Sequence, residues 1–294
     1  KKINFDLLKK MSDSISHRGP DGEGFYVDGN IGLGHRRLEI IDLKTGDQPM
    51  YSFDKNIVIV FNGEIYNYIE LRNELIALGH RFQTLSDTEV IIKSYLQWGL
   101  DCQNKFNGMW AFALWDKKKE QLFLSRDRIG EKPLFYSNIN NTFLFSSEMK
   151  SIFDFGINKE IKEEFLEIYL VMSYVPGSDT FYKNVYKLLP GHFLLVSKSG
   201  TQMHKYWDLP EIDEDNMNRS NSVYEEFASI LEDSVKIRMR SDVPFGAFLS
   251  GGLDSSSIVS LMSKNSNYPI ETFTIGFPNK KYDLDTNLNG EERA

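Results

Sequence analysis

An uninterrupted apolar run from Ile57 to Phe61 is the feature that most constrains the fold of this 294-residue chain. Such a run is typical of a β-strand whose two faces are both buried. Asn62 and Gly63 follow it directly and supply turn chemistry. The run therefore predicts a central strand over residues 56–61, in a sheet that is covered on both sides.

Helical spacing is found on both sides of this strand in the sequence. Apolar residues at positions 7, 8 and 11 predict a helix near the N-terminus. A second helix is predicted from an N-cap at Asn67 to Gly79, and a third from residues 86–89 to Gly99. The second helix is predicted to carry Leu71, Leu75 and Leu78 on one face.

Short strand-like runs separated by turn residues occupy the next hundred residues. They cover residues 109–115, 121–125, 134–137 and 142–146, with further strands within 180–207 and a turn at Pro190 and Gly191. This spacing predicts antiparallel strands. We place the first domain at residues 1–207.

The composition changes after residue 207. Residues 208–222 contain a proline, five acidic residues and no aromatic residue, which is typical of a linker. A helix is then predicted from Ser222 to about Arg240, followed by a strand at 245–249, a helix to Ser263 and a strand at 271–277. The first of these helices is predicted to bury Phe227, Ile230, Leu231 and Val235. This strand–loop–helix–strand order predicts the start of a parallel α/β sheet, so residues 223–294 are interpreted as part of a second domain.

Composition excludes several classes of protein. With 34 Lys and Arg against 42 Asp and Glu, the formal net charge is −8, which argues against general binding of nucleic acid. The sequence lacks an apolar stretch long enough for a transmembrane helix, and its first residues do not form a signal peptide. The single cysteine, Cys102, excludes an internal disulfide and is interpreted as a small buried hydrophobe. These features predict a cytoplasmic enzyme without a membrane partner.

Both ends of the sequence are interpreted as cut. The chain starts with Lys1, directly before helical spacing, and stops at Ala294 in polar sequence. The alternative is a natural short protein.

Residues 250–256 (SGGLDSS) form the most specific motif. Two glycines at the end of a strand allow a ligand to approach the backbone closely, and the following helix N-terminus favours an anion. The lysine of the common phosphate-binding loop GxxxxGK[ST] is missing. A phosphate site of this kind suits the pyrophosphate that leaves when ATP adenylates a carboxylate. On spacing alone, a strand-to-helix turn without a ligand remains the alternative.

Four polar clusters interrupt the apolar pattern of the first domain, at residues 17–21 (HRGPD), 36–38 (RRL), 61–67 (FNGEIYN) and 86–89 (SDTE). Each one alone has a structural explanation as a turn, a helix cap or a surface cation. The five histidines show no metal-ligand spacing, so no structural metal is predicted, and Mg²⁺ is implied only as the partner of ATP phosphates.

Taken together, these motifs resemble two known families. Residues 250–256 are similar to the pyrophosphatase loop (SGGxDSS) of N-type ATP pyrophosphatases, and the four clusters resemble the glutaminase domain of class II glutamine amidotransferases. Their order in one chain resembles the asparagine synthase (glutamine-hydrolysing) family. Residues 126–134 (RDRIGEKPL) and 146–150 (SSEMK) are also similar to stretches of that family.

The resemblance implies a fold and a set of functional residues. The first domain would be an α/β/β/α sandwich of the N-terminal-nucleophile type, and the second a Rossmann-like parallel α/β ATP-pyrophosphatase domain. Arg37 would bind the glutamine carboxylate, Asp87 and Glu64 the ammonium group, and the Asn62 side chain with the Gly63 N–H would form the oxyanion hole. The residues implied in ATP binding are Leu249, Ser250, Gly251, Gly252, Leu253, Asp254, Ser255, Ser256 and Ile275.

The implied reaction is glutamine hydrolysis coupled to ATP-dependent adenylation of aspartate and its amidation to asparagine. A homodimer is implied only at the level of the family. The nucleophile of the family is an N-terminal cysteine, which its spacing to residues 17–21 places about a dozen residues before Lys1. Residues 1–294 are therefore expected to bind glutamine but not to hydrolyse it.

The sequence alone leaves two other functions open. One is an amidotransferase that acts on another carboxylate, in a sugar acid, a peptide or a polysaccharide precursor. The other is a glutamine-binding protein without catalytic activity.

Overall fold

The computed structural model describes residues 2–211 and 222–276 of the chain. The chain forms two compact units, Lys1–Pro210 and Glu211–Ala294. In the first unit, β1 (Gly22–Asp28) and β2 (Ile31–Arg37) form a hairpin. The large antiparallel sheet has the strand order β11-β10-β6-β5-β4-β3, and a smaller sheet has the order β8-β7-β9.

The strands of the large sheet alternate between two cores. They are β3 (Met50–Tyr51), β4 (Ile57–Ile65), β5 (Gly108–Asp116), β6 (Gln121–Arg126), β10 (His192–Ser197) and β11 (Gly200–Lys205). In β4, Ile57, Ile59 and Phe61 point into one core, while Val58 and Val60 point into the other. This period of two confirms that the central strand is buried on both faces.

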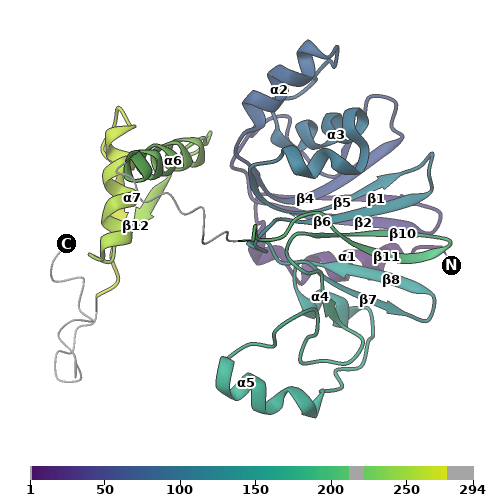
Figure 1. Cartoon of the computed structure of the whole chain (residues 1–294). Coiled ribbons are helices and arrows are strands. Elements are labelled where there is room, and N and C mark those ends of the chain that lie inside the picture. The colour runs from purple at the N-terminus through teal and green to yellow at the C-terminus, as the bar shows by residue number, and fades with distance from the viewer. Residues whose placement is uncertain (1, 212–221, 277–294) are drawn as a thin grey trace. The chain divides into compact units, whose positions relative to one another are not determined.

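Helices cover the outer face of the large sheet, as Figure 1 shows. These are α2 (Tyr68–Ala77) and α3 (Asp87–Trp98), followed by the 3-10 helix η2 (Gly99–Lys105). Of the three leucines predicted on one face of α2, Leu71 and Leu75 are buried, whereas Leu78 is exposed. The helix ends at Ala77, and Gly79 turns the chain away with a positive φ.

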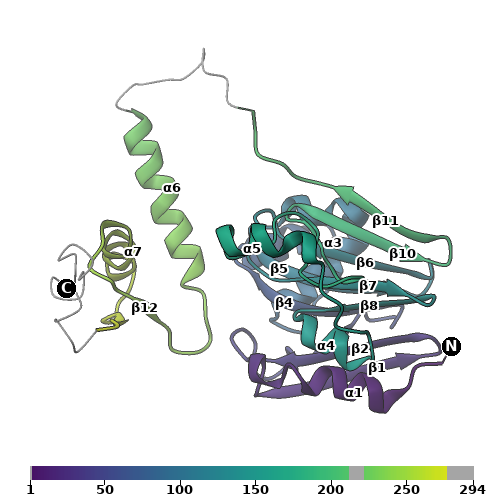
Figure 2. The same cartoon turned by 90° about the horizontal axis from the view of Figure 1, so that it is seen from below.

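The other face of the large sheet packs against the β1–β2 hairpin and the small sheet of β7 (Phe135–Ile139), β8 (Thr142–Ser146) and β9 (Tyr186–Lys187). Outside these strands lie α1 (Phe5–Asp13) and α4 (Met149–Asp154), whose apolar residues share a third core with β8. Figure 2 shows α1 beside β1, β2 and α4. The order helix, sheet, sheet, helix is the four-layered sandwich expected for the first domain.

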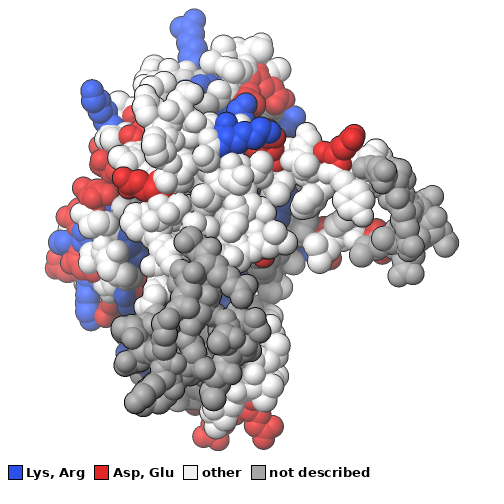
Figure 3. Space-filling model, turned by 90° about the vertical axis from the view of Figure 1, so that its left-hand side faces the viewer, with Lys and Arg blue, Asp and Glu red and all other residues white. Residues whose placement is uncertain are grey.

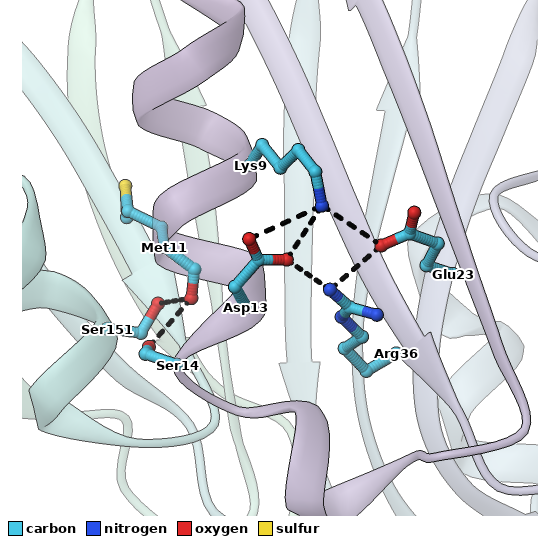
Figure 4. A network of polar contacts seen from close by, with 7 residues as sticks. All are labelled: Lys9, Met11, Asp13, Ser14, Glu23, Arg36 and Ser151. Carbon is cyan, nitrogen blue, oxygen red and sulfur yellow. Dashed lines mark hydrogen bonds and ion pairs between the residues drawn. The ribbon is translucent and has the colours of Figure 1, made fainter.

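Polar contacts fasten α1 to the hairpin (Figure 4). The Arg36 guanidinium contacts Asp13 of α1 and lies 2.8 Å from Glu23 of β1. Lys9 lies 3.0 Å from the same Asp13 carboxylate. On the other side of α1, the Ser151 hydroxyl donates a hydrogen bond of 2.7 Å to the Met11 carbonyl and so joins α1 to α4. These contacts fix the end of β2, where Arg37 follows Arg36.

Three short elements complete the first unit: η1 (Ser16–Arg18), η3 (Glu163–Phe165) and α5 (Leu166–Met172). Cys102 is fully buried in the core beside α3, as expected for a small hydrophobe, and burial raises the pKa of its thiol. Asn67 precedes α2, but its side chain does not cap the helix. Its amide instead pairs with the Asn107 N–H and the Lys105 carbonyl.

The second unit contains α6 (Ser222–Arg238), β12 (Gly246–Phe248), α7 (Leu253–Lys264) and β13 (Glu271–Phe273). β12 and β13 pair in parallel, which confirms the predicted strand–helix–strand unit. Phe227 and Ile230 of α6 are 63% and 61% exposed, so their predicted burial is wrong. Within the described residues only Val235 and Ile237 of this helix are buried. Residues 212–221 of the predicted linker and Phe277 of the predicted last strand lie outside the described residues.

In the described part of the chain, no helix is both long enough and apolar enough to cross a membrane. On the face of the molecule shown in Figure 3, acidic and basic side chains are interspersed, and described Lys and Arg side chains form no continuous band.

Candidate active site

A pocket of about 340 Å³ in the first unit gathers the polar clusters that are separate in the sequence. Its walls come from η1, the end of β2 and the loop after it, the end of β4, and the start of α3. All five residues assigned to glutamine binding from the family resemblance line it: Arg37, Asn62, Gly63, Glu64 and Asp87. The sandwich thus brings together side chains that lie up to fifty positions apart.

Arg37 lies at the end of β2 and is buried. Its Nη1 lies 3.0 Å from Glu39 Oε1 and 2.9 Å from Asp47 Oδ1, and its Nη2 donates to the Asp42 carbonyl at 2.6 Å. The guanidinium is therefore already engaged by its own loop. A guanidinium has five N–H donors, and the Nε edge has no acceptor among the described residues, which leaves one side of the fork for a carboxylate.

Asp87 supplies a buried carboxylate at the first turn of α3. Its Oδ2 accepts a hydrogen bond of 3.0 Å from the Ile65 N–H, and the neighbouring Ser86 side chain caps the helix by accepting from the Thr88 N–H. Burial raises the pKa of Asp87 to about 6, although these N–H donors oppose the shift. A bound ammonium group would compensate the desolvated charge.

Asn62 and Gly63 occupy the end of β4 beside β5. The Asn62 Nδ2 is buried and has no hydrogen-bond partner among the described residues. A buried donor that makes no hydrogen bond costs about 1–3 kcal/mol of stability, so such a donor needs an acceptor from a ligand or another group. Gly63 faces Trp110 of β5 and has φ +155°. A β-carbon at this position would overlap the Met109 carbonyl oxygen and lie 2.8 Å from Trp110 Cα, so only glycine fits.

Side chains rather than a strand hold the peptide group before Asn62. β3 pairs with β4 only at Val58 and Ile59. Further along, the Gln48 side chain accepts from the Phe61 N–H at 2.6 Å and donates to the Phe61 carbonyl at 3.2 Å. His35 Nε2 donates to the same carbonyl at 3.0 Å, and burial lowers the pKa of His35 to about 4, so the imidazole is neutral. No sequence motif marks Gln48 as a residue of the site.

The loop after β6 also supports the site. Asp127 is buried, and its carboxylate accepts from the Trp110 N–H at 3.2 Å and from the N–H groups of Glu131 and Lys132 at 2.9 and 3.0 Å. The Arg126 guanidinium donates to the backbone carbonyls of Gly130 and Lys132 in this loop and to that of Leu188. Lys132 also lines the pocket, and burial together with nearby Arg18 lowers its pKa. Residues 126–134 thus hold β5 against Gly63.

The second unit places the SGGLDSS stretch at the end of β12 and the start of α7. The Leu249 N–H donates to the Phe273 carbonyl at 2.9 Å, and Thr274 Oγ1 donates back to the Leu249 carbonyl at 2.6 Å. Leu249 and Ile275 therefore follow neighbouring parallel strands, at the edge where α/β sheets bind ligands. Gly251 has φ +74°, and the Ser250 N–H lies 3.3 Å from Ser255 Oγ. The loop is exposed at the N-terminus of a twelve-residue helix.

A family model described as glutamine amidotransferase domain matches residues 1–207, and one described as asparagine synthase matches residues 226–287. The chain belongs to the glutamine amidotransferase family. It is 43% identical over 305 residues to a protein of Methanocaldococcus jannaschii named putative asparagine synthetase [glutamine-hydrolyzing] 2, covering 95% of this chain and 58% of the relative. It is 41% identical to asparagine synthetase [glutamine-hydrolyzing] 1 of Bacillus subtilis, covering 92% of this chain and 43% of the relative. The chain thus spans about half the length of these relatives.

A third relative has a different name. It is amidase chry2 of Gibberella zeae, which is 37% identical over 87% of this chain and 38% of its own length. Among solved structures, the glutamine phosphoribosylpyrophosphate amidotransferase of B. subtilis, complexed with ADP and GMP, matches with a TM-score of 0.54 and 16% identity. That match covers 92% of this chain and 63% of the other, and it confirms the N-terminal-nucleophile type of sandwich.

The Asp87 carboxylate predicts a pH dependence for ligand binding at this pocket. An ammonium group binds the ionised form, so we expect glutamine affinity to fall as the pH drops through about 6, approaching tenfold per pH unit below that value. The raised pKa has the opposite effect on stability: the contribution of Asp87 to the free energy of unfolding is present below its ordinary pKa and is lost as the pH rises through 6. Calorimetry between pH 5 and 8 checks the first effect, and melting curves check the second.

The control is Asp87→Asn, which keeps the shape and removes the titration. This variant should bind glutamine weakly at every pH, and the difference between its stability curve and that of the unmodified protein should isolate the Asp87 step. A glutamine affinity of the unmodified protein that is flat from pH 5 to 8 would contradict the assignment.

Proposed function

We propose that this chain is the glutaminase domain and part of the ATP-binding domain of a glutamine-dependent asparagine synthetase. The observation that carries the proposal is one pocket that combines a buried guanidinium, a buried carboxylate and an unpaired amide donor: Arg37, Asp87 and Asn62. A free α-amino acid with a side-chain amide matches this set. The names of the relatives support the reaction.

In the proposed reaction, water hydrolyses glutamine to glutamate and ammonia at this pocket. Asn62 Nδ2 and the Gly63 N–H would stabilise the negative oxygen that forms when the amide carbon is attacked. The loss of one such donor typically costs about 10²–10³ in rate. At residues 249–256 and Ile275, ATP would adenylate aspartate and release pyrophosphate, and ammonia would then displace AMP to give asparagine.

The family resemblance implies a thiol nucleophile, and no cysteine lines the pocket among the described residues. Cys102 is fully buried beside α3 and does not line the pocket, so it does not serve in its place. A polypeptide of residues 1–294 is therefore proposed to bind glutamine without hydrolysing it.

Mg²⁺ would enter the second site with the phosphates of ATP. The described residues hold no group of three or more His, Cys, Asp or Glu side chains that could bind a metal ion by themselves. The cytoplasmic location and the homodimer remain predictions from sequence and family resemblance.

A second candidate is an amidotransferase that uses another acceptor. The similarity to amidase chry2 supports this second candidate. That relative is 37% identical to this chain, and its name is not that of an asparagine synthetase. Its acceptor would be a sugar acid, a peptide or a polysaccharide precursor, while the glutamine site would be the same.

Two measurements test the proposal. Calorimetry on residues 1–294 should show binding of L-glutamine, while an assay for glutamate should show no hydrolysis. The native protein, isolated from its source and supplied with glutamine, aspartate, ATP and Mg²⁺, should produce asparagine, AMP and pyrophosphate in equal amounts. AMP formation only with another carboxylate would favour the second candidate, and the absence of glutamine binding would refute both.

A further inference from the structure

Two separate segments carry the groups that would hold the α-carbon of glutamine. Arg37 ends β2 and begins the loop of residues 38–47, while Asp87 begins α3. Residues of both segments line the pocket. Recognition of an α-amino acid requires a fixed distance between the cation that binds its carboxylate and the anion that binds its ammonium group.

Asp42 contacts both segments at once. Its backbone carbonyl accepts from Arg37 Nη2 at 2.6 Å and from the Gly46 N–H at 3.0 Å. Its carboxylate accepts from the Thr45 N–H at 3.0 Å within its own loop, and from the Leu85 N–H at 2.8 Å. Leu85 lies two residues before Asp87, so one residue joins the Arg37 guanidinium to the segment that carries Asp87.

The surroundings of Asp42 show that this link is specific. The residue is buried, and although burial alone would raise its pKa, hydrogen bonds from Thr45 and Leu85 outweigh burial and hold the pKa below the ordinary value. It also has φ +54°, a left-handed conformation that non-glycine residues rarely adopt. Such a conformation persists only where the surrounding contacts enforce it. If Asp42 stabilised only its own loop, its carboxylate would not also accept a hydrogen bond from the Leu85 N–H, which lies 43 positions away.

We propose that Asp42 is a positioning residue that fixes the separation between the Arg37 guanidinium and the Asp87 carboxylate. This inference rests on the proposed glutamine site. Through that separation, Asp42 makes the pocket selective for an α-amino acid that has both charged groups on one carbon, and Asn62 and Gly63, as the third contact, on the side-chain amide, make that selection specific for the L configuration.

The test compares three ligands on the 294-residue chain and on its Asp42→Asn variant. The asparagine side chain keeps the volume but places an NH₂ group against one of the N–H donors. The ligands are L-glutamine, D-glutamine and 4-aminobutanamide, which lacks the α-carboxylate and so needs no fixed separation. Calorimetry measures the first two, and ligand-observed NMR measures the third.

We expect L-glutamine affinity to fall about tenfold or more, which corresponds to about 1.4 kcal/mol. The ratio of L- to D-glutamine affinity should fall with it, while the affinity for 4-aminobutanamide should stay within about twofold. The matched control is Asp54→Asn, because Asp54 accepts from Ser52 Oγ at 2.7 Å and from the Asn56 N–H at 3.2 Å in a turn that does not line the pocket. This control should leave all three affinities unchanged.

A measurement on the unmodified protein covers the case in which Asp42→Asn does not fold. Glutamine binding should slow hydrogen exchange at the Leu85 and Thr45 N–H groups together, because both donate to the Asp42 carboxylate. Hydrogen-exchange rates at these two groups that do not change when glutamine is added would overturn the inference. So would an Asp42→Asn variant that keeps both the L-glutamine affinity and the L-to-D ratio, or one that weakens all three ligands equally. An unmodified protein that binds no glutamine would refute the proposed function itself.

Discussion

Replacing Arg37 by alanine is expected to weaken the binding of L-glutamine by about 100-fold or more. Truncating one partner of a buried, hydrogen-bonded charge pair costs roughly 2–5 kcal/mol, much of it from the charge left unpaired. Arg37→Lys should recover only part of the loss, because an ammonium group keeps the charge but lacks the planar fork that binds a carboxylate through two parallel bonds. Calorimetry of the three proteins with L-glutamine gives the comparison.

The control for Arg37 has to separate ligand binding from the stability of the loop, since the Arg37 guanidinium also binds the Asp42 carbonyl. Arg128 offers a matched case. Its guanidinium donates to the Phe106 carbonyl at 2.7 Å and to the Asn104 carbonyl at 3.2 Å, and it does not line the pocket. Arg128→Ala should therefore lower stability without changing glutamine affinity. A folded Arg37→Ala protein that binds glutamine within threefold of the unmodified affinity would show that the carboxylate binds elsewhere.

The sequence predicted the elements whose pattern is local. Strands β4 and β5 were predicted because both of their faces are buried, which leaves a continuous apolar run in the sequence. The β1–β2 hairpin was missed, since glycines occupy alternate positions and remove the apolar pattern. A β-carbon at Gly24 would overlap the Gln48 carbonyl, so this position requires glycine because of a contact with a residue 24 positions away.

The same distinction between local and long-range features applies to the residues of the candidate site. Asn62, Gly63 and Asp87 were identified because family motifs mark them, and the structure brings them to one pocket. Gln48 and Asp42 were not identified, because their roles depend on hydrogen bonds to Phe61 and Leu85 that only the folded chain creates. The burial of Phe227 was predicted wrongly for a related reason: helical spacing shows that a face is apolar, but not whether the described part of the chain covers it.

Replacing Gly63 by alanine is expected to destabilise the first unit and to abolish glutamine binding. Its φ of +155° is unfavourable for other residues, and an added β-carbon would overlap the Met109 carbonyl oxygen between two central strands. Backbone strain of about 1–3 kcal/mol adds to an overpacking cost of similar size. At about 2–4 °C per kcal/mol for a protein of this size, the melting temperature should fall by roughly 4 °C or more.

Gly79→Ala separates the two causes of this loss. Gly79 also has a positive φ, +94°, but a β-carbon there would have no atom within 4 Å. It should therefore show only the conformational cost, about 1–2 kcal/mol, and keep its glutamine affinity. The difference between the two melting temperatures measures how tightly β4 and β5 approach beside the site. Because the Gly63 N–H and the Asn62 side chain belong to the same strand end, a shift large enough to admit the methyl group would also move both proposed oxyanion donors. If the Gly63→Ala variant had the same melting temperature as Gly79→Ala and still bound glutamine, the close approach of β4 and β5 could not be the feature that positions these donors.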